Sequence, residues 1–488
     1  MNTPIRRVAL TVMLMIVALL ANLTYIQVIW SDELRAHPRN SRTLTEELAR
    51  QRGDIIVGNE AVATVVETGD NVYPYQRTYP DGPVYAPITG YYSPAGRTGL
   101  ERAEDPVLNG SDDRLFVRRL SDLITGRDAR GGMVELTINR RMQETAYQMM
   151  TDQGLTGSVV AIEPDTGRIL TMVSTPTFDP NDLATLDSEA RSEAITRLEE
   201  DEGRPLHNRA ISETQPPGST FKLLVTAAAL ENGYTADSAV NPASSIQLPG
   251  TNTMLPNFNN NDCGNGRNAT LLQAVEESCN VPFGELADEL GPEVLQEKAE
   301  ALGFSDPDLE IPMTVASSEL GPMSDRPATF QTGIGQRDVR VTPLQNAMMV
   351  ATIANEGTRM QPHVVSTIRS PELDELDQTR PDEVEDAMSP QVAQSLTEMM
   401  IAAEAHAGSE GQIPGVTIAS KTGTAQWGVD PNATNPHAWY VAFAPAEDPQ
   451  VAVAVLVEAG GNVGQGATGG RVAAPIGRAV IGAGLGGG

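Results

Sequence analysis

Three short segments of the sequence carry side chains that together could perform acyl transfer. In the first, QPPGSTFKLLV, Ser219 stands three residues before Lys222, and a helix would place both side chains on one face. A buried lysine can lose its proton and then accept the proton of a serine that attacks a carbonyl carbon. Only three of the 34 lysine and arginine residues are lysine: Lys222, Lys298 and Lys421. Because arginine stays protonated, a lysine kept at this position favours a role in proton transfer.

The Ser-x-x-Lys pair alone would not establish this chemistry, because a helix-capping serine beside a solvated lysine gives the same pattern. Two further segments favour the chemical interpretation. Ser278 and Asn280 follow a predicted helix in EESCNVPF, and Lys421 begins a Lys-Thr-Gly-Thr stretch on a predicted strand in GVTIASKTGTAQW. Ser219 itself is predicted near a helix N-terminus, where free backbone N–H groups favour developing negative charge.

The elements that must position these residues follow the order expected of an α+β domain. Residues 157–175 and 437–461 each predict two strands around a turn, and residues 415–427 predict one more. Helices are predicted between them, at residues 219–230, 270–277, 292–302, 343–355 and 390–404. Strands on both sides of a helical block indicate helices packed on an antiparallel sheet.

Residues 1–31 are predicted to form a cytoplasmic tip and a retained transmembrane anchor. The stretch 8–31 contains no charged residue, and about 20 apolar residues suffice to cross a bilayer as a helix. Two arginines precede it, which predicts a cytoplasmic N-terminus with Tyr25 and Trp30 at the outer interface. A cleaved signal peptide is the alternative, but the stretch is longer than a usual signal core and lacks an A-x-A site.

The rest of the chain is predicted to fold outside the cytoplasm in two parts. Residues 32–140 are rich in turns and predict a small β-rich module, and residues 141–488 predict the α+β domain. A net charge of −30 argues against nucleic-acid binding, which needs a basic face. The five histidines and two cysteines form neither an H-E-x-x-H nor a C-x-x-C motif, so we expect no metal site and no cofactor.

The three chemical segments, in this order, resemble the motifs of the penicillin-binding protein and serine β-lactamase superfamily. Other segments are similar to class B penicillin-binding proteins: RGDI, GLE, GSVVAIEPDTGRIL, RVTPLQNAMMVATIANEG and VEAGG. The membrane-anchored layout also resembles the mycobacterial and corynebacterial penicillin-binding protein A type. The resemblance implies a transpeptidase domain with helices on an antiparallel sheet. About a hundred residues separate it from the anchor, too few for the glycosyltransferase domain of class A members.

The resemblance also implies a role for each residue of the three motifs. Ser219 would be the nucleophile and Lys222 the base that activates it. Ser278 and Lys421 would relay a proton to the leaving amine, while Asn280 would hold the lysine and a substrate amide by hydrogen bonds. Cys279, in the middle of Ser-x-Asn, is a departure that puts little in doubt because that position need not supply a catalytic group.

The strand motif is implied to bind the substrate. Thr422 and Thr424 would hold the terminal carboxylate of the donor peptide, and Gly423 would let the substrate lie along the strand edge. The backbone N–H groups of Ser219 and Thr424 would form the oxyanion hole.

The function implied is a D,D-transpeptidase that cross-links peptidoglycan stem peptides through a Ser219 acyl-enzyme and is acylated by β-lactam antibiotics. A membrane glycosyltransferase of the shape, elongation, division and sporulation type is the implied partner. One alternative is a β-lactamase, which needs a deacylating glutamate in an E-x-x-L-N loop after Ser-x-x-Lys. The nearest match, Asp105 to Asn109, precedes Ser219 and begins with aspartate. The other alternative is a non-catalytic β-lactam sensor or division scaffold.

Cys263 and Cys279 are the only cysteines, and the predicted anchor places both where disulfides persist. We therefore expect a disulfide between them that ties a loop rich in glycine and asparagine to the turn carrying Ser278 and Asn280. The alternative is two unpaired thiols, with Cys279 a small buried residue.

Overall fold

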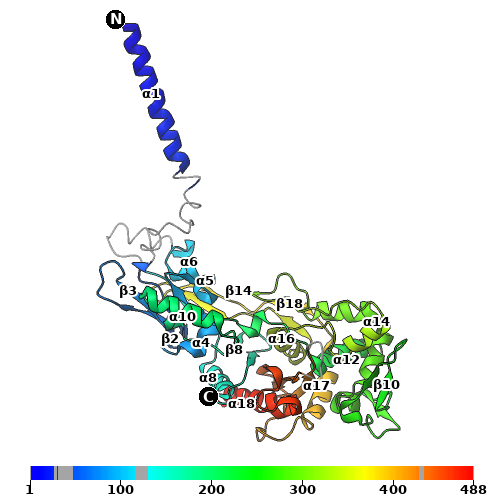
Figure 1. Ribbon diagram of the computed structural model, residues 1–488. Coiled ribbons are helices and arrows are strands. Elements are labelled where there is room, and N and C mark those ends of the chain that lie inside the picture. The colour runs from blue at the N-terminus through cyan, green and yellow to red at the C-terminus, as the bar shows by residue number, and fades with distance from the viewer. Residues whose placement is uncertain (1, 27–29, 31–47, 116–129, 428–433, 487–488) are drawn as a thin grey trace.

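The computed structural model describes residues 2–26, 30, 48–115, 130–427 and 434–486. Helix α1 (Asn2–Thr24) stands outside the folded body of the chain (Figure 1). Its segment Pro4–Thr24 is long and apolar enough to cross a membrane, and it has no buried part. The helix starts earlier than the predicted span, and the predicted far end at residue 31 lies outside the described residues.

A six-stranded sheet joins the N-terminal module to a later part of the chain. Its strand order is β17-β16-β6-β1-β2-β3, and β1 runs parallel to β6. The strands are β1 (Ile55–Val57), β2 (Glu60–Glu67), β3 (Tyr75–Thr78), β6 (Met133–Leu136), β16 (Val365–Arg369) and β17 (Glu375–Gln378). Because β16 and β17 come from beyond residue 140, this sheet extends across the predicted boundary between the two parts.

The N-terminal module also contains helices and a buried network of charges. Among the described residues of the module, three short helices follow β3: α4 (Gly82–Thr89), α5 (Gly99–Ala103) and α6 (Asp105–Leu108). The carboxylate of Glu101 accepts from Arg52 Nε and Arg77 Nε, each at 2.6 Å, and Asp105 pairs with Arg52 at 2.6 Å. Buried charges must be paired and hydrogen-bonded to be tolerated, so this network fixes how the RGDI and GLE segments pack.

The predicted antiparallel sheet of the larger domain has five strands in the order β19-β20-β21-β7-β8. They are β19 (Ala419–Ala425), β20 (His437–Ala444), β21 (Val451–Val457), β7 (Gly157–Ile162) and β8 (Ile169–Thr175). All residues of the other four strands are buried, which means that both faces of the sheet are covered. Strand β19 carries the Lys-Thr-Gly-Thr motif and forms one edge of this sheet, so among the described strands it pairs with β20 alone.

Helices cover the two faces of this sheet. On one face, α8 (Arg140–Thr151) and α18 (Ala474–Leu485) lie side by side (Figure 1) and pack against Val159 and Val453. On the other, α16 (Pro343–Ala354) packs in the core that contains Val160 and Ala454. Successive residues of a strand point to opposite faces, which is why neighbours on β7 and β21 enter different cores.

Most of the predicted helices are confirmed with small shifts at their ends. Helix α17 (Pro390–Glu404) coincides with its prediction, while α12 (Lys222–Glu231) and α13 (Leu271–Glu276) begin within a few residues of theirs. For α14 (Val281–Ala301), the prediction of a helix from Pro292 is confirmed, but the stretch over residues 281–290 was not predicted. Two helical stretches meet at Gly291, whose φ of 83° is non-helical, and Pro292 begins the second stretch.

Candidate active site

Ser219 lies in a short turn that packs against the edge strand and leads into a helix. A 3₁₀ turn (η3, Gly218–Phe221) leads directly into α12, and Ser219 is half-buried within it. Gly218 has a φ of 55°, and a Cβ atom there would lie 2.8 Å from Thr424 O. Only glycine suits this conformation and this approach, so the turn can bring Ser219 close to β19.

Lys222 is completely buried beside the Ser-x-Asn motif. Its Nζ donates to Ser278 O at 2.7 Å and to Asn280 Oδ1 at 2.9 Å, and it lies 3.5 Å from Ser278 Oγ. In the described part of the chain, no hydrogen bond joins Lys222 Nζ to Ser219 Oγ. The structure therefore brings the first two motifs together through Lys222 and the Ser-x-Asn turn.

The environment of Lys222 favours its neutral form. Burial lowers the pKa of Lys222 well below its usual value, and the charge of Lys421 lowers it further. A neutral amine has two N–H donors and one lone pair. Ser278 O and Asn280 Oδ1 take the two donors, so the lone pair is left to accept a proton from a hydroxyl group.

Lys421 reaches the same serine from the strand side. Its Nζ donates to Ser278 Oγ at 2.7 Å and to Thr422 O at 3.2 Å, and burial lowers the pKa of Lys421 to about 7. Ser278 has a φ of 59°, which is unusual for a residue with a side chain. Strained backbone of this kind persists where surrounding contacts fix it and clusters at functional sites.

The other residues of the motif lie on the edge strand, against which the turn with Ser219 packs. Thr422 and Thr424 are half-buried, whereas Gly423 is buried. A Cβ atom on Gly423 would lie 2.9 Å from Pro217 O and 3.0 Å from Trp439 Cβ. The glycine is therefore required for packing between the Ser219 turn and the sheet.

The loop before the Ser-x-Asn motif holds Asn280, and sequence reasoning missed its part. Asn257 Oδ1 accepts from the backbone N–H of Asn280 at 2.8 Å and of Val281 at 2.9 Å. Asn280 Nδ2 in turn donates to Pro256 O at 2.7 Å. Nothing in the sequence singles out Asn257 among the many asparagines of this loop.

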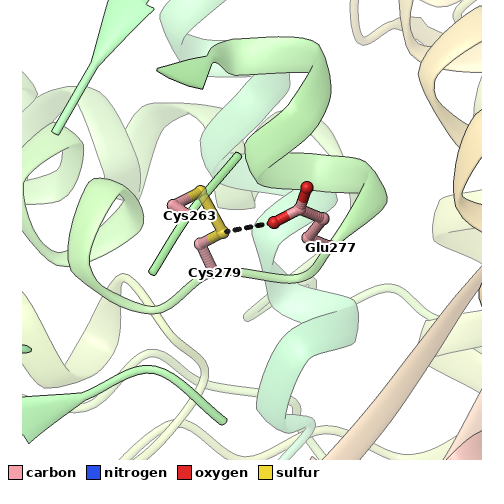
Figure 2. Close-up of side chains that lie close together, drawn as sticks. All are labelled: Cys263, Glu277 and Cys279. Atoms are coloured by element: carbon pink, nitrogen blue, oxygen red, sulfur yellow. Dashed lines mark hydrogen bonds between the residues drawn. A yellow bond between two sulfur atoms is a disulfide. The ribbon is translucent and has the colours of Figure 1, made fainter. Parts of the chain in front are cut away.

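The structure joins Cys263 and Cys279 in a disulfide, with Cα atoms 5.9 Å apart (Figure 2). The Glu277 carboxylate lies beside it and accepts from the backbone N–H of Gly264 at 2.9 Å. Among the described residues, these three side chains form the one grouping with metal-ligand spacing, and both sulfur atoms are used in the disulfide.

A buried cluster behind β19 was also missed, because its members are far apart in sequence. The carboxylate of Glu404 pairs with Arg478 at 2.7 Å and accepts from Tyr440 OH at 3.0 Å and from the Ser420 hydroxyl. Ser420 immediately precedes Lys421 on β19. The cluster therefore ties α17 and α18 to the strand that presents Lys421.

Both parts of the chain match families of known proteins. Residues 157–482 match the penicillin binding protein transpeptidase domain, and residues 52–134 match the penicillin binding protein A dimerisation domain. The chain is 52% identical to peptidoglycan D,D-transpeptidase PbpA of Mycolicibacterium smegmatis and 50% identical to PbpA of Mycobacterium tuberculosis. Each alignment covers 99% of both chains.

Solved structures agree with this assignment. The ceftriaxone acyl-enzyme of penicillin-binding protein A from M. tuberculosis has a TM-score of 0.88 and 49% identity. It covers 90% of this chain and 100% of that one. The penicillin G acyl-enzyme of the same protein has a TM-score of 0.86, again with 49% identity, and covers 89% of this chain and 100% of that one. From its motifs, its fold and these relatives, the chain belongs to the class B penicillin-binding proteins.

Proposed function

We propose that this protein is a serine D,D-transpeptidase that cross-links the stem peptides of peptidoglycan. The observation that carries the proposal is the convergence of two buried lysines on Ser278, directly beside the turn that presents Ser219. Relatives of about 50% identity are named peptidoglycan D,D-transpeptidases, and the M. tuberculosis neighbour forms acyl-enzymes with β-lactams.

In the acylation step, Lys222 removes the proton of Ser219 Oγ, which attacks the carbonyl carbon of the penultimate D-Ala of a donor peptide. The backbone N–H groups of Ser219 and Thr424 stabilise the oxyanion of the tetrahedral intermediate. The C–N bond to the terminal D-Ala then breaks. Its amine leaves with a proton delivered through Ser278 Oγ, which lies between the two lysines. Thr422 and Thr424 hold the terminal carboxylate of the donor.

In the second step, the amine of a neighbouring stem peptide attacks the acyl-enzyme. The new peptide bond forms, the bond to Ser219 Oγ breaks, and the acceptor's proton returns to the serine by way of the same lysines. Asn280 holds Lys222 throughout, since its Oδ1 accepts from Nζ. No oxidant, metal or cofactor enters this balance.

A β-lactam takes the place of the donor peptide and leaves a stable adduct on Ser219. The lactamase alternative needs a carboxylate that prepares a deacylating water. Asp105, the start of the nearest sequence match, is instead paired with Arg52 at 2.6 Å and Arg97 at 3.0 Å in the N-terminal module. Because these ion pairs hold the Asp105 carboxylate in the N-terminal module, it does not prepare such a water, and this favours slow release of the adduct over turnover of the lactam.

An exchange assay tests the transpeptidase proposal. The full-length protein in detergent is given a donor peptide ending in D-Ala-D-Ala and a labelled D-amino acid as acceptor. We expect the label to replace the terminal D-Ala, and no exchange with Ser219→Ala. Hydrolysis of the donor without exchange, or exchange by Ser219→Ala, would contradict the proposal.

We further propose that α1 anchors the protein with its N-terminus in the cytoplasm. The arginine pair at residues 6–7 near the start of the helix supports this orientation through the positive-inside rule. The domain limits 1–31, 32–140 and 141–488 remain predictions. Labelling of a cysteine introduced at residue 3 tests the orientation, because an impermeant reagent should reach it only after the cells are opened.

Family resemblance supports one further proposal, that a membrane glycosyltransferase of the shape, elongation, division and sporulation type binds the N-terminal module. Such a partner would supply new glycan strands next to the transpeptidase. Site-specific photo-crosslinking from exposed Val66 on β2 tests this, since the adduct should contain a polytopic membrane protein. Crosslinking only to soluble proteins would contradict it.

A further inference from the structure

Helix α14 begins without a cap of its own. Asn280 occupies the N-cap position, but its φ and ψ are helical and its side chain makes no capping hydrogen bond. An asparagine at this position normally accepts from the free N–H groups of the first turn. Here the side chain is used elsewhere, because Oδ1 accepts from Lys222 Nζ and Nδ2 donates to Pro256 O.

Asn257 supplies the missing cap from a separate segment. Its Oδ1 accepts from the backbone N–H groups of Asn280 and Val281, at 2.8 and 2.9 Å. Its Nδ2 donates to Ala243 O and Asn261 O, both at 3.0 Å, so all four hydrogen bonds of the amide are made. The residue is only 5% exposed. A buried and fully bonded amide of this kind has one orientation, and so it fixes the groups that it binds.

Two residues that are adjacent in the chain, Pro256 and Asn257, therefore bind different groups of Asn280. Pro256 O takes the side-chain amide, and Asn257 takes the backbone. The next anchor of the same loop, Cys263, is bonded to Cys279 one residue away. The remaining residue of the Ser-x-Asn motif, Ser278, is bound by the two lysines: Lys222 donates to its carbonyl oxygen and Lys421 donates to its hydroxyl oxygen.

We propose that Asn257 is a positioning residue for acylation, which acts by holding Asn280 so that its Oδ1 meets Lys222 Nζ. The inference rests on the proposed function. Without Asn257, the N–H groups of Asn280 and Val281 lose their acceptor and the start of α14 shifts. A shift of about 1 Å in a catalytic group can lower a rate about a hundredfold. Lys222 then loses the acceptor that directs its lone pair toward a hydroxyl group.

A double-mutant cycle tests this inference on the full-length protein in detergent, with a fluorescent penicillin as the probe. We expect Asn257→Ala to lower the second-order acylation rate constant at least tenfold. In the Asn280→Ala background the same substitution should change the rate less than twofold, because the group that it positions is gone. Equal fold-changes in both backgrounds, or an unchanged rate in the single variant, would overturn the proposal.

Two further variants separate positioning from a general effect on folding. Asn268→Ala removes an exposed asparagine of the same loop, at a position without a positive φ, and should leave the rate unchanged. Asn257→Asp keeps an oxygen that accepts from both N–H groups but loses the two hydrogen bonds to Ala243 O and Asn261 O, so it should recover part of the rate that Asn257→Ala loses. If Asn257→Ala does not fold, the cycle is run with Asn257→Leu, and the same comparison decides. Failure of wild-type protein to be acylated at Ser219 would instead overturn the proposed function itself.

Discussion

Lys421 Nζ lies 2.7 Å from Ser278 Oγ, although 143 positions separate the two residues in the chain. The same hydroxyl oxygen lies 3.5 Å from Lys222 Nζ. Ser278 thus stands between two buried amines, one on a helix and one on the edge strand. A proton can pass between the amines through this hydroxyl group, which gives each lysine a separate task and makes their roles testable.

Replacing each lysine by arginine should have unequal effects. Lys222→Arg keeps a positive charge but cannot accept a proton, so acylation by penicillin should fall by about 10²- to 10⁴-fold, the usual contribution of general base catalysis. Lys421→Arg should be milder, because arginine keeps a positive charge beside Thr422 and Thr424, the residues that we propose hold the substrate carboxylate. Second-order acylation rate constants give the comparison. Equal losses would mean that the two roles are divided wrongly.

Burial of Lys421 should make stability depend on pH. Its pKa falls from 10.5 in the unfolded chain to about 7 in the folded protein. Between these values the unfolded state binds more protons, so the free energy of unfolding rises with pH by up to about 1.4 kcal/mol per unit. Chemical denaturation between pH 7 and 10 should show a shallower rise for Lys421→Met than for wild type. Parallel curves would contradict this.

The disulfide should contribute to both stability and rate. The bridge joins cysteines that are 16 residues apart. Closing a loop of this length stabilises the fold by about 3 kcal/mol in the chain-entropy model. Cys263→Ser with Cys279→Ser should lower the free energy of unfolding by about that amount and slow acylation, since the bridge ties the loop to the Ser278 turn. Reductant should slow wild type but not the double variant. Two alkylatable thiols in wild type without reductant would refute the bridge.

Gly423 should not tolerate a methyl group. The added Cβ would lie 2.9 Å from Pro217 O and 3.0 Å from Thr220 Cγ2, both in the packed turn around Ser219. Gly423→Ala should therefore lower the melting temperature and slow acylation together, at a cost of about 1–3 kcal/mol. Gly482→Ala is the matched control, because its Cβ would meet Ile413 at an ordinary 3.6 Å. Similar behaviour of the two variants would contradict the prediction.

The sheet and most helices could be predicted because their signals are local. A continuous run of apolar residues marks strands such as β7, and Pro390 marks the start of α17. Helix α14 was only half predicted: Gly291 and Pro292 mark the start of its second stretch, but residues 281–290 were not recognised as helical. The crossing of residue 140 by the six-stranded sheet was missed, since pairing of β6 with β16 leaves no local signal.

Part of the candidate site could likewise be predicted from local signals in the sequence, and part of it could not. Residues 219, 222, 278, 280 and 421 could be proposed because their spacing forms recognisable motifs, and hydrogen bonds join the last four of them in the structure. Asn257 and the cluster of Glu404 with Arg478 could not, because their importance comes from where the fold places their side chains. A buried amide or carboxylate is functional only through its partners, and those partners are distant in sequence.

The central claim is that Ser219 is the nucleophile, and the site of the penicillin adduct tests it most directly. Full-length wild type and Ser219→Ala are incubated with penicillin G and analysed by intact-protein mass spectrometry, followed by peptide mapping. We predict one added penicillin in wild type, located on Ser219 and persisting far longer than seconds, and none in Ser219→Ala. An adduct that survives in Ser219→Ala, or that maps to another residue, would contradict the assignment. Release from wild type within seconds would show a lactamase instead.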